Sequence, residues 1–284
     1  MKKKNGEVNL RPFAVKIMSK RQLCKMAEYV NEEHGSCGMK KVTAEDKVRR
    51  EIEIMRHLFH RNVVLLFEVI EGQNDQCDEE SFICMVMELM KGPSMKYFND
   101  GKFYINGTEG LVYSEMEAKS LFRDLLSGLQ YLHDKKICHR DIKPDNLMIY
   151  ENGTLRIADF GCARKFPPDS NPVLRNTDGT FSFLAPECLN EKGEFYCPFK
   201  ADIWASGITL YAWIFGVVPF YRTSPEPLYE AIRSDPLEFG SALHDGSIEI
   251  FVGVLNRDPE KRFSIERCLR SKWFDGFPSP SYQV

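Results

Sequence analysis

Apolar and polar residues alternate over residues 11–19, and this pattern predicts a β-strand. The two faces of the strand would carry different side chains: Phe13, Val15 and Ile17 on one, and Ala14, Lys16 and Met18 on the other. Asn5-Gly6 gives the strongest short signal for a hairpin turn, so we expect this strand to belong to an antiparallel sheet. Residues 25–42 are polar and contain glycine, and we expect a loop insertion without regular structure there.

Helical spacing follows this insertion. Thr43 and Asp46 have the spacing of a capping box, which predicts the start of a helix. The apolar stripe of that helix would consist of Val48, Ile52, Met55 and Phe59. Two further strands are predicted over residues 63–70 and 81–89, separated by an acidic turn.

The second part of the chain is mainly helical. Another capping box, from Ser114 to Glu117, precedes apolar residues at helical spacing up to residue 132. Short strands over residues 147–150 and 154–158 flank an Asn-Gly turn. Beyond residue 185 the pattern indicates helices and loops. The sequence thus predicts an α+β fold, with a small, mainly antiparallel β part over residues 1–90 and a larger, mainly α-helical part over 91–284.

Composition places the chain among ordinary globular proteins, with 43% hydrophobic and 28% charged residues in 284. The net charge of -3 gives no electrostatic support to a nucleic-acid or anionic-membrane partner. The nine cysteines form no CxxC pair, which favours reduced thiols in the cytoplasm or nucleus over a disulfide framework or zinc site. The first ten residues lack an apolar core, so we expect no signal peptide.

One segment imitates a membrane span. Residues 203–221 carry no formal charge and are long enough to cross a bilayer. They also contain serine, threonine, glycine and proline, and Asp202 precedes them. We therefore expect a helix buried in the protein interior and keep a membrane anchor as the weaker alternative.

Three short motifs follow one another in the second part: His139 to Asn146 reads HRDIKPDN, Asp159 to Gly161 reads DFG, and Ala185 to Glu187 reads APE. Asn146 and Asp159 flank the predicted hairpin symmetrically, so strand pairing would bring them side by side. An amide oxygen and a carboxylate suit magnesium. The alternative is that Asn146 only caps a turn and Asp159 only ends a strand.

In this order and spacing the motifs identify the chain as similar to the eukaryotic protein kinases from about residue 4 to residue 275. The resemblance implies ATP and Mg2+ as cofactors, with Asn146 and Asp159 as metal ligands. It implies that Asp141 is the catalytic base and that Lys143 contacts the transferred phosphate. Tyrosine kinases usually carry another residue at the position of Lys143, so serine or threonine substrates are expected. Arg140 resembles the arginine that pairs with a phosphorylated activation loop, whereas His139 would be a packed structural residue.

The resemblance also assigns the nucleotide site. Lys16 would bind the ATP phosphates and pair with a glutamate of the following helix, while Ala14 would line the adenine pocket. Glu51 and Glu53 compete as that partner, and Glu51 is chosen because it flanks the apolar stripe and has the family's distance from His60. The lobe-linking segment supplies three more cofactor-binding residues, and Met148 would form the pocket floor. These three are Met87, Glu88 and Met90.

Two further residues have structural roles in the resemblance. Asp202 would support the segment from His139 to Asn146, called the catalytic loop from here on, without taking part in catalysis. Glu187 would form an ion pair with Arg262, the alternative being two separate surface charges.

The pattern departs from the family before Lys16, where the sequence shows no Gly-x-Gly-x-x-Gly. Either the natural chain is longer and the N-terminal part is incomplete, or the protein handles ATP without this loop, and we favour the first. The chain taken alone should then bind ATP weakly, because the loop's backbone donors are missing.

Three features resemble the calcium/calmodulin-dependent kinase kinases and related upstream kinases of the AMP-activated kinase. They are the long insertion between Lys16 and Glu51, the Gly-Pro-x-Met segment after residue 91, and the segment 175–180. Many kinases are activated by a phosphothreonine four residues before the position of Thr180, where this chain has Asn176. We expect activity that does not depend on phosphorylation there, with Thr177 as the fallback site.

The sequence therefore predicts an ATP-dependent serine/threonine protein kinase. Another kinase is a candidate for its protein substrate. Calmodulin regulation has no support, because no basic amphipathic segment follows the catalytic domain in the sequence. The rival hypothesis is a pseudokinase-like scaffold with negligible turnover, favoured by the missing glycine-rich loop.

Overall fold

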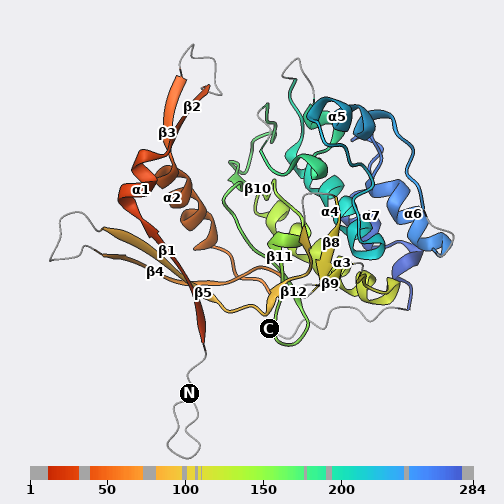
Figure 1. Ribbon diagram of the computed structural model, residues 1–284, viewed down its shortest axis with the longest axis horizontal. Coiled ribbons are helices and arrows are strands. Elements are labelled where there is room, and N and C mark those ends of the chain that lie inside the picture. The colour runs from red at the N-terminus through yellow and green to blue at the C-terminus, as the bar shows by residue number, and fades with distance from the viewer. Residues whose placement is uncertain are drawn as a thin grey trace, which may run out of the picture. The chain divides into compact units, whose positions relative to one another are not determined.

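A computed structural model of the protein describes residues 12–31, 39–72, 81–97, 101–105, 108–109, 111–175, 178–189, 194–239 and 243–276 (Figure 1). They divide into two compact units. One comprises the described residues of Met1–Phe59 and Val64–Met90, and the other those of His60–Val63 and Lys91–Val284. The fold is α+β, with antiparallel sheets in the first unit and mainly helices in the second.

The first unit is built on a three-stranded antiparallel sheet in the order β1-β5-β4. These strands are β1 (Phe13–Ser19), β5 (Phe82–Glu88) and β4 (Leu66–Gly72). Phe13, Val15 and Ile17, predicted to share one face of β1, are all more than half exposed. On the other face Ala14 and Met18 are partly buried, but Lys16 is exposed, so burial follows the predicted alternation only in part. The strand predicted from residue 63 begins only at Leu66. Val63 belongs to the second unit and makes an isolated bridge there with Ile157 of strand β12 (Leu155–Ile157).

Two helices accompany this sheet. Helix α1 (Lys20–Lys25) was not predicted, because its polar sequence has no apolar stripe, although Ser19 caps it by accepting from the Gln22 amide. Helix α2 (Ala44–Met55) begins with the predicted capping box of Thr43 and Asp46. Phe59, assigned to the apolar stripe, is 81% exposed, because the helix ends at Met55 and the stripe ends with it.

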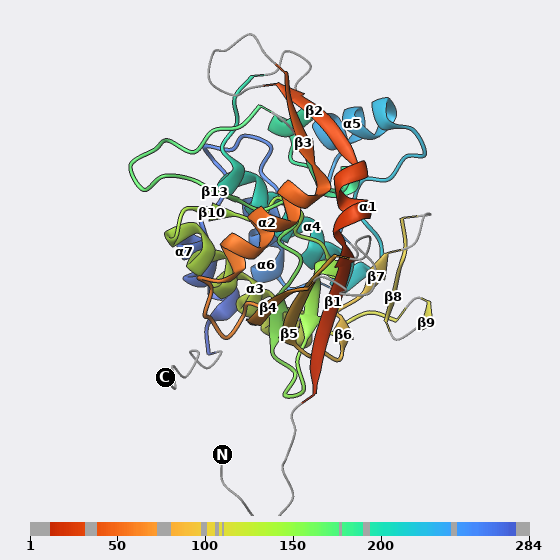
Figure 2. The same ribbon diagram turned by 90° about the vertical axis from the view of Figure 1, so that its left-hand side faces the viewer.

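The prediction of an unstructured insertion over residues 25–42 was wrong. Strands β2 (Ala27–Asn31) and β3 (Met39–Thr43) form an antiparallel pair within it, and Figure 2 shows this pair extending past α1 and α2. Each strand is only five residues long and mixes charged with apolar residues, so no clear two-residue period marks it. Pairing between the two strands, rather than a local pattern in either, accounts for this part of the structure.

The second unit is organised around two long helices, α3 (Glu115–Asp134) and α4 (Pro198–Phe215). α4 accounts for most of the uncharged run and is buried on nearly all sides, with Trp204 and Trp213 fully buried. It ends at Gly216, whose φ of 72° suits glycine. Within the described part of the chain, no helix is both long and apolar enough to span a bilayer. Shorter helices complete the unit: α5 (Pro225–Ser234), α6 (Asp245–Val254) and α7 (Ile265–Leu269).

Short strands bring the motif residues of the second unit together. β6 (Gly92–Pro93), β11 (Leu147–Ile149) and β12 form one sheet, with the predicted turn between the last two. β10 (Ile137–Cys138) pairs with β13 (Arg164–Lys165), and the HRDIKPDN and DFG motifs lie between these two strands in the sequence. A third sheet precedes α3 and contains β7 (Lys96–Tyr97), β8 (Phe103–Ile105) and β9 (Thr108–Glu109).

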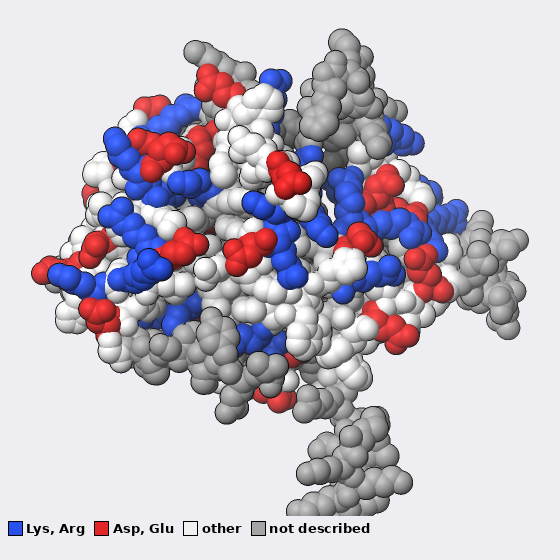
Figure 3. Space-filling view, turned by 180° about the vertical axis from the view of Figure 1, so that it is seen from behind, with Lys and Arg blue, Asp and Glu red and all other residues white. Residues whose placement is uncertain are grey.

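The charged side chains show no broad area of one sign on the face in Figure 3. Lys and Arg alternate there with Asp and Glu among the described residues. This mixture accords with the near balance of 38 basic and 41 acidic residues in the sequence.

Candidate active site

In the first unit, Lys16 and Glu51 form the central contact. The Nζ atom of Lys16 on β1 lies 3.0 Å and 3.1 Å from the two carboxylate oxygens of Glu51 on α2. Glu51 is buried because it lies three residues after Val48 and four before Met55, on the buried face of the helix. Of the two glutamates considered, Glu51 therefore makes the contact, whereas Glu53 is exposed and pairs with His57.

A second charge network ties α2 to the sheet, and sequence reasoning missed it. Glu71 at the end of β4 accepts from Lys20 at 2.7 Å and from Arg49 at 3.2 Å, and Arg49 also binds Glu45. Hydrogen bonds from Lys20 and Arg49 hold the pKa of Glu71 below its ordinary value. Lys20 belongs to the unpredicted helix α1, so no local pattern could indicate that it reaches Glu71. The network positions the helix that carries Glu51.

The residues assigned to the adenine pocket lie on several strands. Ala14 on β1 is the direct cross-strand partner of Met87 on β5. The amide of Glu88 donates to the Leu65 carbonyl at 3.0 Å, so an adenine hydrogen bond at Glu88 would use its carbonyl oxygen. Met90 ends the first unit, and Met148 lies on β11 of the second unit; both are half-buried.

In the second unit, Asp202 at the start of α4 supports the catalytic loop, as predicted. Its carboxylate accepts from the amides of His139 at 2.9 Å and Arg140 at 2.8 Å, and from the His133 ring at 2.9 Å. Asp202 is almost fully buried, so these bonds also satisfy its charge. His139 is the packed residue expected, because its ring bonds to the Ala158 carbonyl and accepts from the Asp141 amide.

Asp141 stands at the centre of a cluster of polar contacts. Lys143 Nζ lies 2.8 Å from one of its carboxylate oxygens, and the Asn146 side chain donates to the same oxygen at 2.9 Å. The amide and hydroxyl of Thr180 lie 3.1 Å and 3.0 Å from the other oxygen. Burial alone would raise the pKa of Asp141, but Lys143 and Thr180 outweigh it and hold that pKa below the ordinary value.

Asn146 and Asp159 are brought together by the β11–β12 pairing. The amide of Ala158 donates to the Asn146 carbonyl at 2.9 Å. Asp159 follows Ala158 directly in the sequence, so this hydrogen bond brings it near Asn146. The side-chain nitrogen of Asn146 donates to the carbonyl and to the carboxylate of Asp141. These two hydrogen bonds do not use the side-chain oxygen of Asn146. Asp159 is exposed.

This donor set fits a magnesium ion. Mg2+ is usually held by one or two protein oxygens, with water and phosphate oxygens completing its coordination. Within the described ranges no group of three His, Cys, Asp or Glu residues could hold a metal, so an all-protein cage is not built here. A carboxylate beside an amide oxygen is the kind of open, hard-oxygen site that Mg2+ takes together with nucleotide phosphates.

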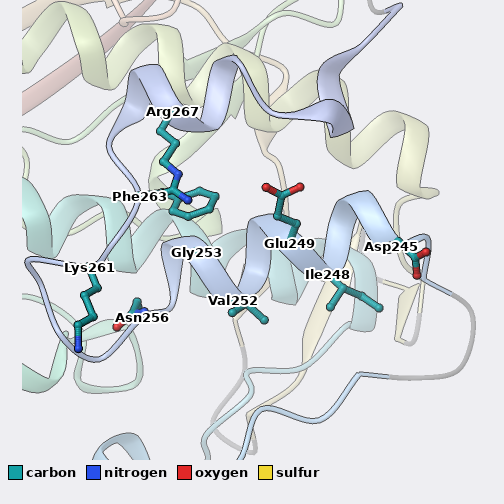
Figure 4. A pocket seen from close by; sticks show the side chains of 9 residues that line it. All are labelled: Asp245, Ile248, Glu249, Val252, Gly253, Asn256, Lys261, Phe263 and Arg267. Atoms are coloured by element: carbon teal, nitrogen blue, oxygen red, sulfur yellow. The ribbon is translucent and has the colours of Figure 1, made fainter.

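A groove of about 620 Å³ lies elsewhere in the second unit, along α6 and the segment before α7 (Figure 4). Arg267 stacks on Phe263 with its guanidinium 3.7 Å from the ring centre, and Glu249 and Asp245 project from α6. None of the residues in the Asp141 cluster lines this groove. The groove is therefore separate from the candidate site at the catalytic loop.

The family model described as the protein kinase domain matches residues 8–274 of this chain. The chain belongs to the protein kinase family. The calcium/calmodulin-dependent protein kinase kinase of Caenorhabditis elegans is 38% identical over 230 residues, which cover 80% of this chain and 40% of that protein. The serine/threonine-protein kinase GRIK2 of Arabidopsis thaliana is 36% identical over 234 residues, 82% of this chain and 54% of that protein. The serine/threonine-protein kinase TOS3 of Saccharomyces cerevisiae is 32% identical over 241 residues, 77% of this chain and 42% of that protein.

The Caenorhabditis elegans relative agrees with the resemblance to calcium/calmodulin-dependent kinase kinases drawn from the sequence. The chain spans about half the length of the curated relatives it matches. Among the kinase features predicted from sequence, the ion pair of Glu187 and Arg262 is confirmed, with two contacts of 2.6 Å and 2.8 Å. Asn176 and Thr177, and residues 1–11 where the glycine-rich loop was sought, lie outside the described residues.

Proposed function

We propose that the chain is the catalytic domain of an ATP- and Mg2+-dependent protein kinase that phosphorylates serine or threonine. The contacts of Thr180 are the observation that carries this proposal. Its hydroxyl lies 3.0 Å from Asp141 and 2.7 Å from Lys143. An aliphatic hydroxyl is thus held between a carboxylate and an ammonium, which are the groups needed to accept its proton and to stabilise an adjacent phosphate.

The protonation state of Asp141 suits this role. Because its pKa is lowered, the carboxylate is ionised at neutral pH and can accept the hydrogen bond of a substrate hydroxyl. Lys143 would neutralise charge on the transferred phosphate, and bound Mg2+ would supply further neutralisation at Asn146 and Asp159. Lys16, held by Glu51, would bind the α and β phosphates.

Activity is tested by transfer of labelled phosphate from ATP to a generic serine- or threonine-containing protein substrate. Asp159→Ala removes a proposed metal ligand and Asp141→Asn removes the proposed base. Each should lower the initial rate by at least about 100-fold, in line with the usual contribution of general acid–base and metal groups. Equal transfer by the wild type and both variants would reject the enzyme. A folded wild-type protein with no transfer would favour the scaffold alternative.

A second protein kinase is the substrate class that we propose. The support is the name of the Caenorhabditis elegans relative, a protein kinase kinase, together with the sequence resemblance to upstream kinases. The comparison to make is between an inactive kinase with an intact activation loop and the same kinase with its loop threonines replaced by alanine. Transfer to the first only is expected, and equal transfer to both would contradict this substrate class.

A further inference from the structure

The segment Asp178–Thr180 docks on the catalytic loop at three successive residues. The Asp178 carboxylate lies 2.8 Å from Nη2 of Arg140, and Thr180 binds Asp141 and Lys143. Gly179 between them adopts a φ of 112° and approaches so closely that an added Cβ would lie 2.5 Å from the Arg140 carbonyl oxygen. The segment thus meets the loop through charge, backbone proximity and hydrogen bonds at adjacent positions.

The Arg140 side chain is the buried partner in this docking. Only 10% of it is exposed, against 54% for Asp178. A buried guanidinium needs a counter-charge and acceptors, since its desolvation is costly. The Cys162 carbonyl and the Tyr196 side chain provide polar contacts, and Asp178 provides a carboxylate. Burial alone would lower the pKa of Arg140, but the charge of Asp178 contributes to a net increase.

We propose that Asp178 is a built-in positioning residue that acts as the anion for Arg140 and holds Thr180 against Asp141 and Lys143. Under this proposal the catalytic loop reaches its working arrangement with no phosphate on the segment that precedes Thr180. The idea deepens the proposed function and rests on it for its kinetic consequences. Its structural part, the docking of Asp178–Thr180, does not depend on turnover.

The test uses the full chain, treated with phosphatase and shown by intact mass to carry no phosphate. Asp178→Asn keeps the size of the side chain and removes its charge, while Asp178→Glu keeps the charge. Asp235→Asn is the matched control, because Asp235 pairs with Arg222 at 2.6 Å but both side chains are substantially exposed. The kinetic measurements are kcat and the KM for ATP.

We expect Asp178→Asn to lower kcat about ten-fold, the effect of losing one charge-assisted hydrogen bond, with the KM for ATP changed by less than about two-fold. Asp178→Glu should recover at least half of the wild-type kcat, and Asp235→Asn should behave as the wild type. An unaltered kcat in Asp178→Asn would overturn the proposal. So would a wild-type enzyme that loses its activity when phosphate is removed.

Hydrogen exchange of the Thr180 amide supplies a readout that needs no activity. This amide donates to Asp141, so it should be protected in the wild type and in Asp235→Asn. Its exchange should become about ten-fold faster in Asp178→Asn and return toward the wild-type rate in Asp178→Glu. If the wild type shows no turnover, the proposed function fails while this measurement still decides the role of Asp178; equal exchange rates in all four proteins would refute that role.

Discussion

Replacing Glu187 by glutamine should destabilise the second unit strongly, because it breaks a buried, two-point ion pair. The carboxylate of Glu187 contacts both terminal nitrogens of Arg262, and that arginine side chain has no exposed surface. Glutamine has nearly the same shape but offers only one acceptor and no charge. The substitution therefore leaves the buried guanidinium with an uncompensated charge.

The contacts that remain to Arg262 set the size of the effect. Removing one partner of a buried ion pair costs about 3–5 kcal/mol. Arg262 keeps hydrogen bonds to the carbonyls of Lys200 at 2.8 Å and Asn256 at 2.9 Å, and it lies over the Trp204 ring. Glu187 is also 13% exposed, so water can reach its position. We therefore expect the lower end, about 3 kcal/mol in the free energy of unfolding.

Urea and thermal unfolding, followed by tryptophan fluorescence, measure this loss. At about 2–4 °C for each kcal/mol in a unit of this size, the melting temperature should fall by about 6–12 °C. Asp235→Asn, which breaks an exposed Arg–Asp pair, should cost no more than about 1 kcal/mol. A Glu187→Gln protein that unfolds with the same midpoint as Asp235→Asn would refute the assignment of a buried, stabilising ion pair.

Three further outcomes are expected. Burial lowers the pKa of His60, which stacks on Tyr131. The stability that the neutral imidazole contributes should therefore be complete above about pH 6.5 and should be lost as pH falls through the folded-state pKa. In denaturation curves measured from pH 5 to 8, His60→Phe should reduce this loss of stability at acid pH. Asp202→Asn should lower the free energy of unfolding by about 1–3 kcal/mol, because at least one of the His139 and Arg140 amides loses its acceptor. Hydrogen exchange at these amides should become faster, and unchanged exchange would contradict this. Burial raises the pKa of Cys162 to about 11, so about one thiol in a thousand is ionised at pH 8, and maleimide labelling followed by peptide mass should be far slower than in unfolded protein.

The fold was most predictable where a local signal and a buried face coincide. Both capping boxes appear, at Thr43 and Ser114, because each places an acceptor where a helix start has unpaired amides. The short hairpin around Asn152 also forms as predicted, over slightly narrower limits. Elements that depend on distant partners were missed: α1 has no apolar stripe, and β2 and β3 acquire their structure by pairing with each other.

The candidate site shows the same division. The motif residues could be named from sequence because their spacing is characteristic. The choice of Glu51 over Glu53 followed from helix geometry together with the family's distance from His60. The contacts of Thr180 and Asp178 were not foreseen. They lie 37 or more residues from the groups they bind, and a serine, threonine or aspartate in a loop carries no local sign of such a partner.

Backbone strain at the catalytic motifs explains why the site needs these distant partners. Arg140 and Asp159 are two of the three described non-glycine residues with positive φ, at 72° and 59°. This conformation costs about 1–2 kcal/mol for each residue. At Arg140 the cost is offset by the buried Asp202 carboxylate, which fixes two successive amides, and by the docking of Asp178 on the side chain. The motif letters therefore specify which groups are present, whereas two carboxylates from outside the motif, Asp202 and Asp178, bind the backbone and the side chain of the strained residue Arg140.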